Sequence, residues 1–217
     1  MDIEELEALA SRFKYKNLLN RYKVLEEIFD IKEGDTVIDG GSYKGDMALY
    51  FSKKVGTDGR VYAFEPIFDN FKVLINFCIN NNLTNVIPYQ LALSDENKKV
   101  QFYMSEYTNA GSILPEFRKV NPDDFLFTRT ASVDTLIKKH KMESKIDYVW
   151  TNIEGAELKA IKGMKQMLKD NDCQLCISTH RISDTYTNTE DVEKLLQSYG
   201  YGTERIKGHE FWIYARK

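Results

Sequence analysis

TVIDGGSYKGD, residues 36–46, holds the strongest fold signal in this sequence. Its apolar start, residues 36–38, is typical of a buried parallel strand, and an acid, Asp39, ends that run. A glycine turn follows at residues 40–45, and the residues from Asp46 to Phe51 have the apolar spacing of a helix. A strand, a glycine loop and a helix N-terminus in this order form a unit at which proteins bind nucleotide-like cofactors.

The acid at position 39 restricts the kind of cofactor that suits this loop. Free amides at a helix N-terminus attract anions, so a diphosphate would suit the glycines. It would be repelled by the carboxylate of Asp39 beside them. A cofactor with a cationic centre would suit both features. S-adenosylmethionine carries a sulfonium, an ammonium and no phosphate, so we expect it to be the cofactor.

Length and composition indicate one soluble globular unit. The 217 residues are enough for a single sizeable core, and no apolar run is long enough to span a bilayer. The formal net charge of -3 disfavours a bulk attraction to nucleic acid or to an anionic membrane. The N-terminus, MDIEELEALA, is acidic and does not resemble a secretory signal. We therefore expect a cytoplasmic protein.

The three cysteines, Cys78, Cys173 and Cys176, indicate a reducing compartment without a disulfide framework. Two of them have a CxxC spacing, but they lie in CQLCIST, which has the pattern of a buried strand. Residues three apart in a strand point to opposite faces and cannot chelate one ion. We predict small core side chains and no metal site there.

Strand and helix patterns alternate along the rest of the chain. Residues 2–30 have the apolar spacing of an amphipathic helix, in one piece or two. We assign residues 1–34 to an N-terminal helical extension or cap and residues 35–217 to the main domain. Strands are predicted at 36–38, 60–65, 86–91, 99–104, 127–131, 146–153, 173–179, 201–206 and 210–215, and helices at 68–81, 133–140, 156–168 and 189–199. This series predicts a doubly wound α/β sheet in three αβα layers, mostly parallel, with a C-terminal antiparallel hairpin.

Residues 105–126 lack a clear periodicity and contain Gly111, Pro115 and Pro122. An irregular segment of this length inside a compact domain is often a lid or a binding loop. Residues 111–125 are therefore our candidate substrate lid.

Ligands of a doubly wound fold bind beyond the carboxyl ends of the strands. Glu65, followed by Pro66 and Ile67, lies about 20 residues past the glycine loop, where such folds hold ribose hydroxyls. A surface acid is the plainer interpretation. An NAD enzyme would share this acid, but GGSYKG is not G-x-G-x-x-G. Ala92 and Leu93, after the third strand, suit either the flank of an adenine ring or a plain turn.

A second polar group follows the strands at 146–153 and 173–179. Asn152, Glu154 and Glu157 gather where a strand ends and a helix begins. The two acids either cap that helix or orient a substrate hydroxyl or the cofactor ammonium. His180 ends the next strand and is of the type that accepts a hydroxyl proton near neutral pH. A structural or solvated histidine fits the pattern equally well.

Five segments and the strand before His180 together resemble the FkbM-type methyltransferases. In chain order the segments are DTVIDGGSYKGD, VYAFEP, LALSDENKKVQFY, TASVDTLI and NIEGAELKAIKG. The similarity runs from about residue 35 to the C-terminus, and EGAELKAIKG is its most specific element. The resemblance implies a class I methyltransferase (Rossmann-like) fold, S-adenosylmethionine as donor, and O-methylation in glycan, natural-product or cell-surface pathways. By matching positions it implies Asp39, Gly41, Gly45 and Glu65 for the cofactor, and Glu154, Gly155 and Glu157 as the family element.

The chain departs from the family pattern at Asn152, where Asp is usual, and at Ser178, where an acid is usual. The missing carboxylate at position 152 weakens any metal proposal, because hard cations need several anionic oxygens. It also removes one candidate base.

We therefore predict an S-adenosylmethionine-dependent O-methyltransferase that acts on a hydroxyl of a small molecule, sugar or glycan. His180, assisted by Glu154, is the expected base, and Asn152 positions the acceptor or the cofactor. The alternatives are a non-catalytic cofactor-binding or scaffold protein and an NAD-linked oxidoreductase. Nucleic acid is not an expected partner, and the N-terminal helices either cap the site or pair subunits in a homo-oligomer. The predicted cofactor residues are Asp39, Gly40, Gly41, Ser42, Tyr43, Gly45, Asp46, Glu65, Pro66, Ile67, Ala92 and Leu93.

Overall fold

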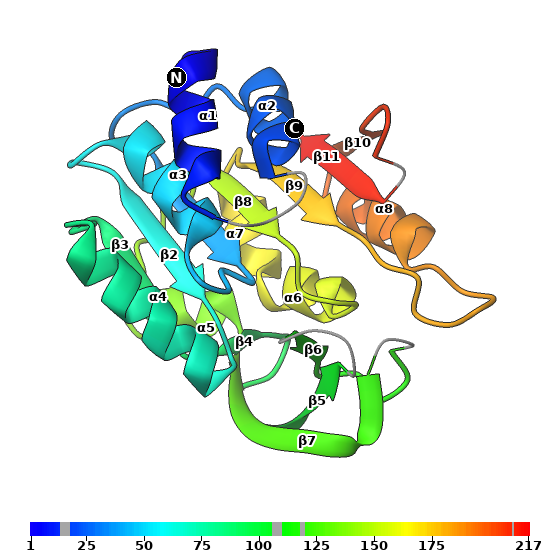
Figure 1. The fold of residues 1–217 in the computed structure, drawn as a ribbon. Helices are drawn as coiled ribbons and strands as arrows, with labels where there is room; N and C mark the ends of the chain where they lie inside the picture. The colour runs from blue at the N-terminus through cyan, green and yellow to red at the C-terminus, as the bar shows by residue number, and fades with distance from the viewer. Residues whose placement is uncertain (14–17, 106–109, 118–119, 210) are drawn as a thin grey trace.

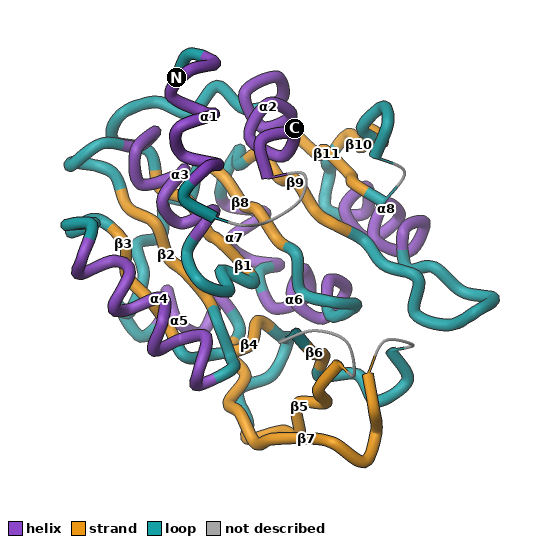
Figure 2. Tube along the Cα trace, in the orientation of Figure 1, coloured by secondary structure: helices purple, strands orange, loops and turns teal. Residues whose placement is uncertain are grey.

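A seven-stranded sheet runs through the middle of the molecule, in the order β10-β11-β9-β8-β1-β2-β3 (Figures 1 and 2). The computed structural model describes residues 1–13, 18–105, 110–117, 120–209 and 211–217. The strands of this sheet are β1 (Thr36–Gly40), β2 (Arg60–Phe64), β3 (Val86–Tyr89), β8 (Tyr148–Thr151), β9 (Gln174–Ser178), β10 (Gly202–Arg205) and β11 (Trp212–Arg216). Neighbouring strands from β3 to β9 are parallel, and β11 is antiparallel to both β9 and β10. The prediction of a mostly parallel sheet with a C-terminal antiparallel hairpin is confirmed.

Helices cover both faces of this sheet and complete the three predicted layers (Figure 1). On one face lie α1 (Ile3–Ser11), α2 (Leu18–Ile28), α3 (Asp46–Val55) and α4 (Phe68–Asn80), which share a core with Val37 and Trp150. On the other lie α5 (Val133–Lys138), α6 (Glu157–Gly163), α7 (Lys165–Asp170) and α8 (Thr189–Ser198), packed on Ile38 and Val149. Val37 and Ile38 belong to different cores because successive strand residues point to opposite faces.

The same alternation places the two cysteines of the CxxC spacing. Cys173 is buried in the core on the α5–α8 side, and Cys176 is buried in the core on the α1–α4 side. They pack as small apolar side chains on opposite faces, as predicted.

The N-terminal segment forms two helices that belong to the main core. Leu6 of α1 and Tyr22 and Leu25 of α2 are buried in the same cluster as Val37. The Tyr22 hydroxyl donates a hydrogen bond of 3.0 Å to the backbone carbonyl of Asp46, at the start of α3. The helix pair is therefore fixed against the element that follows the glycine loop.

The segment predicted to be irregular, residues 105–126, contributes β6 and the first part of β7 to a second, smaller sheet, so this part of the prediction is wrong. Its strand order is β4-β7-β5-β6, with β4 (Ala92–Leu93), β5 (Lys99–Ser105), β6 (Gly111–Ser112) and β7 (Val120–Ala131). β7 begins seven residues before the predicted strand at 127, and its first part contains Pro122 and an interrupted register opposite Tyr103 and Ser105. A proline beside a bulge hides the strand pattern. Residues 106–109 of this segment, and residues 118–119 of the candidate lid, lie outside the described residues.

The predicted helix at 156–168 is two helices that meet at Met164. The Cβ that any other residue would add at Gly163 would lie 1.9 Å from the backbone oxygen of Ser94. The close approach of the segment after β4 explains the glycine, and the helical backbone is interrupted at Met164, with φ -118° and ψ 19°.

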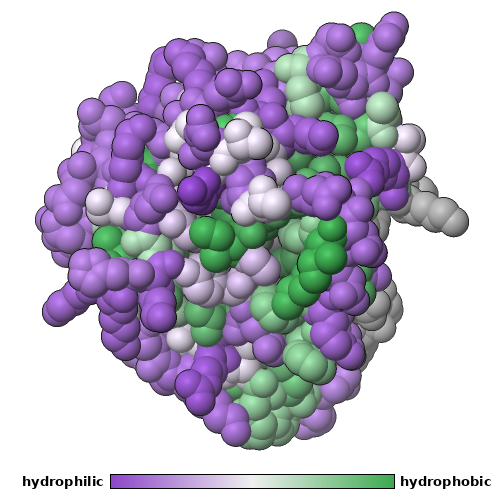
Figure 3. Space-filling view, turned by 90° about the vertical axis from the view of Figure 1, so that its left-hand side faces the viewer, coloured by the Kyte–Doolittle hydropathy of each residue, from purple (hydrophilic) through white to green (hydrophobic). Residues whose placement is uncertain are grey.

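The surface in Figure 3 is largely hydrophilic, with hydrophobic side chains gathered in patches. Exposed apolar residues include Phe68 and Ile79 of α4 and Phe127 of β7. Within the described residues, we find no helix with the length and apolar character needed to cross a membrane.

Candidate cofactor and acceptor site

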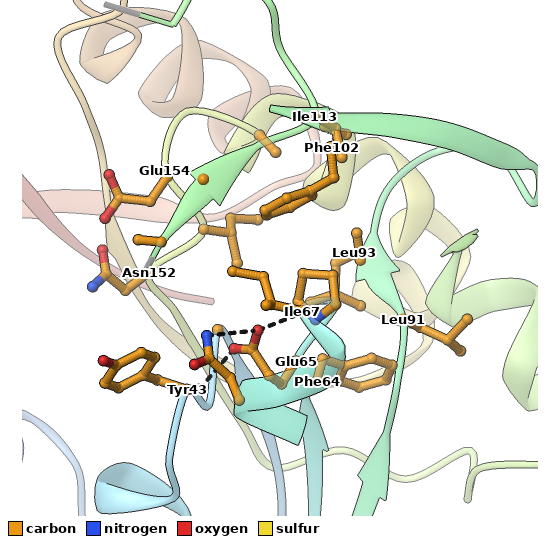
Figure 4. Close-up of a pocket in the computed structure, with 18 of the residues that line it drawn as sticks. Tyr43, Phe64, Glu65, Ile67, Leu91, Leu93, Phe102, Ile113, Asn152 and Glu154 are labelled. Carbon is orange, nitrogen blue, oxygen red and sulfur yellow. Dashed lines mark hydrogen bonds between the residues drawn. The ribbon is translucent and has the colours of Figure 1, made fainter. Parts of the chain in front are cut away.

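A cavity of about 360 Å³ opens at the carboxyl ends of β1, β2 and β8, where the sheet topology predicts a ligand (Figure 4). Ten predicted site residues line it: Gly41, Tyr43, Asp46, Glu65, Pro66, Ile67, Ala92, Leu93, Asn152 and Glu154. Five others, Asp39, Gly40, Ser42, Gly45 and His180, are not among the lining residues. Lining residues that sequence reasoning missed include Arg21, Met47, Phe64, Asn70, Leu91, Phe102, Ala110, Trp150 and Ile153.

Gly41 is a glycine for two separate reasons. Its φ of +85° is a left-handed conformation that disfavours a side chain, and a Cβ would lie 2.2 Å from the backbone oxygen of Asn152. The backbone amides of Gly41 and Ser42 both donate hydrogen bonds of 3.0 Å to the carbonyl of Phe64. The glycine loop is therefore clamped between the ends of β2 and β8, and its open side faces the cavity.

Asp39 lies behind this loop and does not line the cavity. Its side chain is fully buried, and neither carboxylate oxygen has a hydrogen-bond partner among the described residues. The Ser42 hydroxyl donates to the backbone carbonyl of Asp39, at 2.9 Å. Burial raises the pKa of Asp39 to about 8; the nearby carboxylates of Asp46 and Glu65 contribute to this rise, and Ser42 opposes it. An ionised Asp39 thus lacks a compensating positive charge.

Glu65 ties the glycine loop to the segment after β2 (Figure 4). Its carboxylate accepts hydrogen bonds from the amide of Tyr43 at 3.0 Å, the amide of Ile67 at 2.9 Å and the side chain of Asn70 at 3.4 Å. Burial raises the pKa of Glu65 to about 7, and these hydrogen bonds oppose the rise. Glu65 is a buried acid that faces the cavity, so the interpretation as a surface acid is excluded.

The cavity has an apolar end and a polar end. In Figure 4, Phe64, Ile67, Leu91 and Leu93 lie on one side, and Tyr43, Asn152 and Glu154 on the other, with Glu65 between them. Phe102 of β5 and Ile113, which follows β6, extend the apolar wall. The strand at 99–104 was predicted, but the contact of Phe102 with the site was not.

Part of the predicted lid forms a wall of the cavity. Gly111 and Ile113 line it, together with Ala110 just before the lid. A Cβ at Gly111 would lie 2.7 Å from the ring of Phe102 and 2.2 Å from the carbonyl oxygen of Tyr103. The ring of Phe117 stands edge-on to the imidazole of His180, with 5.8 Å between the ring centroids.

His180 is held beside the polar end by buried partners. Its Nδ1 lies 2.9 Å from Oε1 of Glu157, and its Nε2 lies 3.8 Å from Oε2 of Glu154, which lines the cavity. Glu154 has a φ of 50°, which is rare outside glycine, and the following Gly155 has a φ of 95°. Because of this turn, Glu154 and Glu157 reach different nitrogen atoms of the same imidazole.

Glu157 joins His180 to the start of its own helix, α6. It is completely buried, and its Oε1 also accepts a hydrogen bond of 3.2 Å from the backbone amide of Gly155, just before α6. Its carboxylate also accepts from the side chain of Asn188 at 2.7 Å, while Oδ1 of Asn188 accepts from the His180 backbone amide at 2.7 Å. Asn188, just before α8, was not anticipated, because an asparagine before a helix signals only a cap.

The charges around the cavity favour a cationic ligand. The lining includes the carboxylates of Asp46, Glu65 and Glu154, and Asp39 lies behind the glycine loop. A diphosphate in this place would face several acids, whereas a sulfonium or ammonium would be attracted to them. The described residues therefore fit S-adenosylmethionine better than a dinucleotide.

Comparisons with known proteins agree with this geometry. The family model described as the methyltransferase FkbM domain matches residues 39–202. A search of curated proteins found no match. Three solved structures have similar folds at low sequence identity, so they support the fold alone.

The methyltransferase FkbM structure from Methylobacillus flagellatus is 16% identical, with a TM-score of 0.59; the match covers 98% of this chain and 58% of that one. A SAM-dependent O-methyltransferase from Thermotoga maritima is 13% identical, with a TM-score of 0.56, and the match covers 100% and 71%. Aeropyrum pernix fibrillarin, solved with natively bound S-adenosyl-L-methionine, is 13% identical, with a TM-score of 0.52 and coverage of 90% and 74%.

Proposed function

The chain belongs to the FkbM methyltransferase family, and we propose that it transfers the methyl group of S-adenosylmethionine to a hydroxyl oxygen of a small molecule, sugar or glycan. The observation that carries the choice of cofactor is the group of buried acids at the glycine loop. Asp39 has no hydrogen-bond partner for its carboxylate among the described residues, and Asp46 and Glu65 lie near it.

Each part of the cavity suits one part of this cofactor. The apolar end, with Ile67, Leu93 and Phe102, would take the adenine ring. Glu65 already accepts one hydrogen bond at Oε2 and two at Oε1, so Oε2 retains a lone pair that would accept from a ribose hydroxyl. The polar end, with Tyr43 and Asn152, would take the amino acid portion.

The bound cofactor supplies a methyl group already activated by the sulfonium. The protein therefore has to align the acceptor and remove its proton. The carboxylate of Glu157 fixes the proton of His180 on Nδ1, which leaves Nε2 to accept a proton. Nε2 faces Glu154 at the edge of the cavity, and the carboxylate of Glu154 would stabilise the imidazolium that forms.

The proposed acceptor is a hydroxyl compound and not a nucleic acid, because acids outnumber the one cation that lines the described cavity, Arg21. We also propose that the protein acts in the cytoplasm, and that the N-terminal helices, α1 and α2, cap the site or pair subunits. Their buried residues pack against the main core, which favours the cap.

A substrate screen with methyl-labelled S-adenosylmethionine tests the function. We expect the label to appear on a hydroxyl oxygen of one compound class, with S-adenosylhomocysteine formed in equal amount. The His180→Ala variant serves as the background control. Label transferred to nitrogen or carbon would contradict O-methylation. Cofactor binding without transfer to any hydroxyl, amine or RNA acceptor would favour the non-catalytic alternative.

A further inference from the structure

The second N-terminal helix places a cation at the cofactor cavity. Tyr22 of α2 is fully buried, donates to the backbone carbonyl of Asp46, and stacks on Tyr50 of α3 with 4.9 Å between ring centroids. These contacts fix α2 against the first turn of α3, directly after the glycine loop. The preceding residue, Arg21, consequently lies at the cavity and lines it.

Arg21 is the one Lys or Arg side chain among the described residues that line this cavity. Its charge lowers the pKa of Asp46, although burial raises that pKa overall. Within the described part of the chain, no carboxylate lies within 4.0 Å of its guanidinium, so no ion pair occupies it. Arg21 is half-buried, and it retains donors for a ligand.

The polar end of the cavity poses a problem for the amino acid portion of the proposed cofactor. That portion carries an ammonium and a carboxylate. Asp46 and Glu154 suit the ammonium, but both repel the carboxylate. A guanidinium presents a planar pair of donors that matches a carboxylate, and it stays charged at every relevant pH. Among the described lining residues the one guanidinium is that of Arg21, which lies near Asp46.

We propose that Arg21 binds the α-carboxylate of the cofactor and makes the site selective for ligands that carry this group. This inference rests on the proposed function, since it concerns the same cavity and cofactor. Arg21 lies outside residues 39–202, the part of the chain that matches the family model. The N-terminal helices would then complete the cofactor site of this protein, in addition to covering its core.

Calorimetric titration with two probes tests the assignment. The first is S-adenosylhomocysteine, and the second is its decarboxylated analogue, which keeps the amine and lacks the carboxylate. Wild-type protein should bind S-adenosylhomocysteine more tightly. Arg21→Met should weaken that binding by about 10- to 100-fold, the usual range for a charge-assisted pair. The same variant should bind the analogue at least as tightly as wild type does.

Control variants separate this effect from general damage. Lys23→Met removes an exposed cation from the same helix and should leave both affinities unchanged. Arg21→Lys keeps the charge without the planar donor pair and should restore part of the discrimination.

Unchanged S-adenosylhomocysteine affinity in Arg21→Met, or an equal loss for both probes, would overturn the assignment. If wild-type protein bound neither probe, the proposed function itself would fail, and the assignment with it.

Discussion

The Nδ1 atom of His180 lies 2.9 Å from Oε1 of Glu157, a carboxylate with no exposed surface. An ionised carboxylate only accepts hydrogen bonds, so Nδ1 of the neutral imidazole must carry the proton. Nε2 is then the basic nitrogen, and it is the one that faces Glu154 at the cavity. Two acids separated by three positions in the sequence thus contact different nitrogens of one imidazole, and Glu154 is the one that lines the cavity.

Removal of His180 should impair turnover without impairing cofactor binding. For His180→Ala we expect turnover to fall by about 10²- to 10⁴-fold, the usual contribution of a general base. The affinity for S-adenosylhomocysteine, measured by calorimetry, should change little, because His180 does not line the cavity. His140→Asn, an exposed histidine with a φ of 53°, is a matched control. Normal turnover in His180→Ala would remove it as the base.

Glu157→Gln should lower turnover through His180 alone. Glutamine keeps the shape and can still accept from Asn188, but it no longer enforces the proton on Nδ1. We expect a loss on the order of 10- to 100-fold, with no change in cofactor affinity. The double variant with His180→Ala should be no slower than His180→Ala alone, because residues that act as a unit are not additive. Additive losses would contradict the claim that Glu157 acts through His180.

Gly41→Ala and Gly34→Ala form a matched pair. Both glycines have a positive φ, +85° and +90°, but a Cβ at Gly34 meets nothing within 4 Å, whereas one at Gly41 would lie 2.2 Å from a backbone oxygen. Gly34→Ala should cost about 1 kcal/mol of unfolding free energy. Gly41→Ala should cost more and should also abolish S-adenosylhomocysteine binding. Equal stability and intact binding in the two variants would show that the loop is not clamped against β8.

Asp39 should make the unliganded protein less stable as the pH rises. Its pKa is near 3.9 in an unfolded chain and about 8 in the fold. The folded state therefore binds the proton more tightly, and the stabilisation is complete below about pH 4. It is lost as the pH rises through about 8. Asp39→Asn, measured by thermal unfolding, should gain melting temperature relative to wild type between pH 6 and 8.5.

Asp124→Asn, which removes an exposed acid, is the control and should not reproduce that gain. A constant difference between Asp39→Asn and wild type across this pH range would mean that Asp39 does not titrate there.

Much of the fold could be predicted from sequence because its signals are local. The apolar run before Asp39, the glycine turn and the alternation of strands with helices each depend on neighbouring residues, and they predict the parallel sheet correctly. The second sheet could not be predicted in full, because β7 pairs with β5 over a long separation and contains Pro122. The glycine at position 163, next to the break at Met164, is required by the close approach of Ser94, about 70 residues earlier in the sequence.

The candidate site likewise contains residues that the sequence predicts and residues that it does not. Gly41 and Glu65 are predictable because each directly follows a strand whose carboxyl end forms the cavity. Arg21 and Asn188 are not, because they reach the site through tertiary contacts that leave no periodic pattern. Asp39 was expected to contact the cofactor but is buried behind the loop, where burial raises its pKa to about 8. The position of Asp39 in the sequence shows that it lies near the end of a strand, but it does not show whether its side chain points toward the cavity or away from it.

The most direct test of this account is calorimetric titration of the wild-type protein with S-adenosylmethionine and, separately, with NADH. The acids at positions 39, 46 and 65 predict saturable one-to-one binding of S-adenosylmethionine. Its affinity should rise from pH 6 to 8.5, because a cationic ligand favours the ionised form of Glu65, whose pKa is about 7, and of Asp39. Tighter binding of NADH, or no binding of S-adenosylmethionine across this range, would contradict the account.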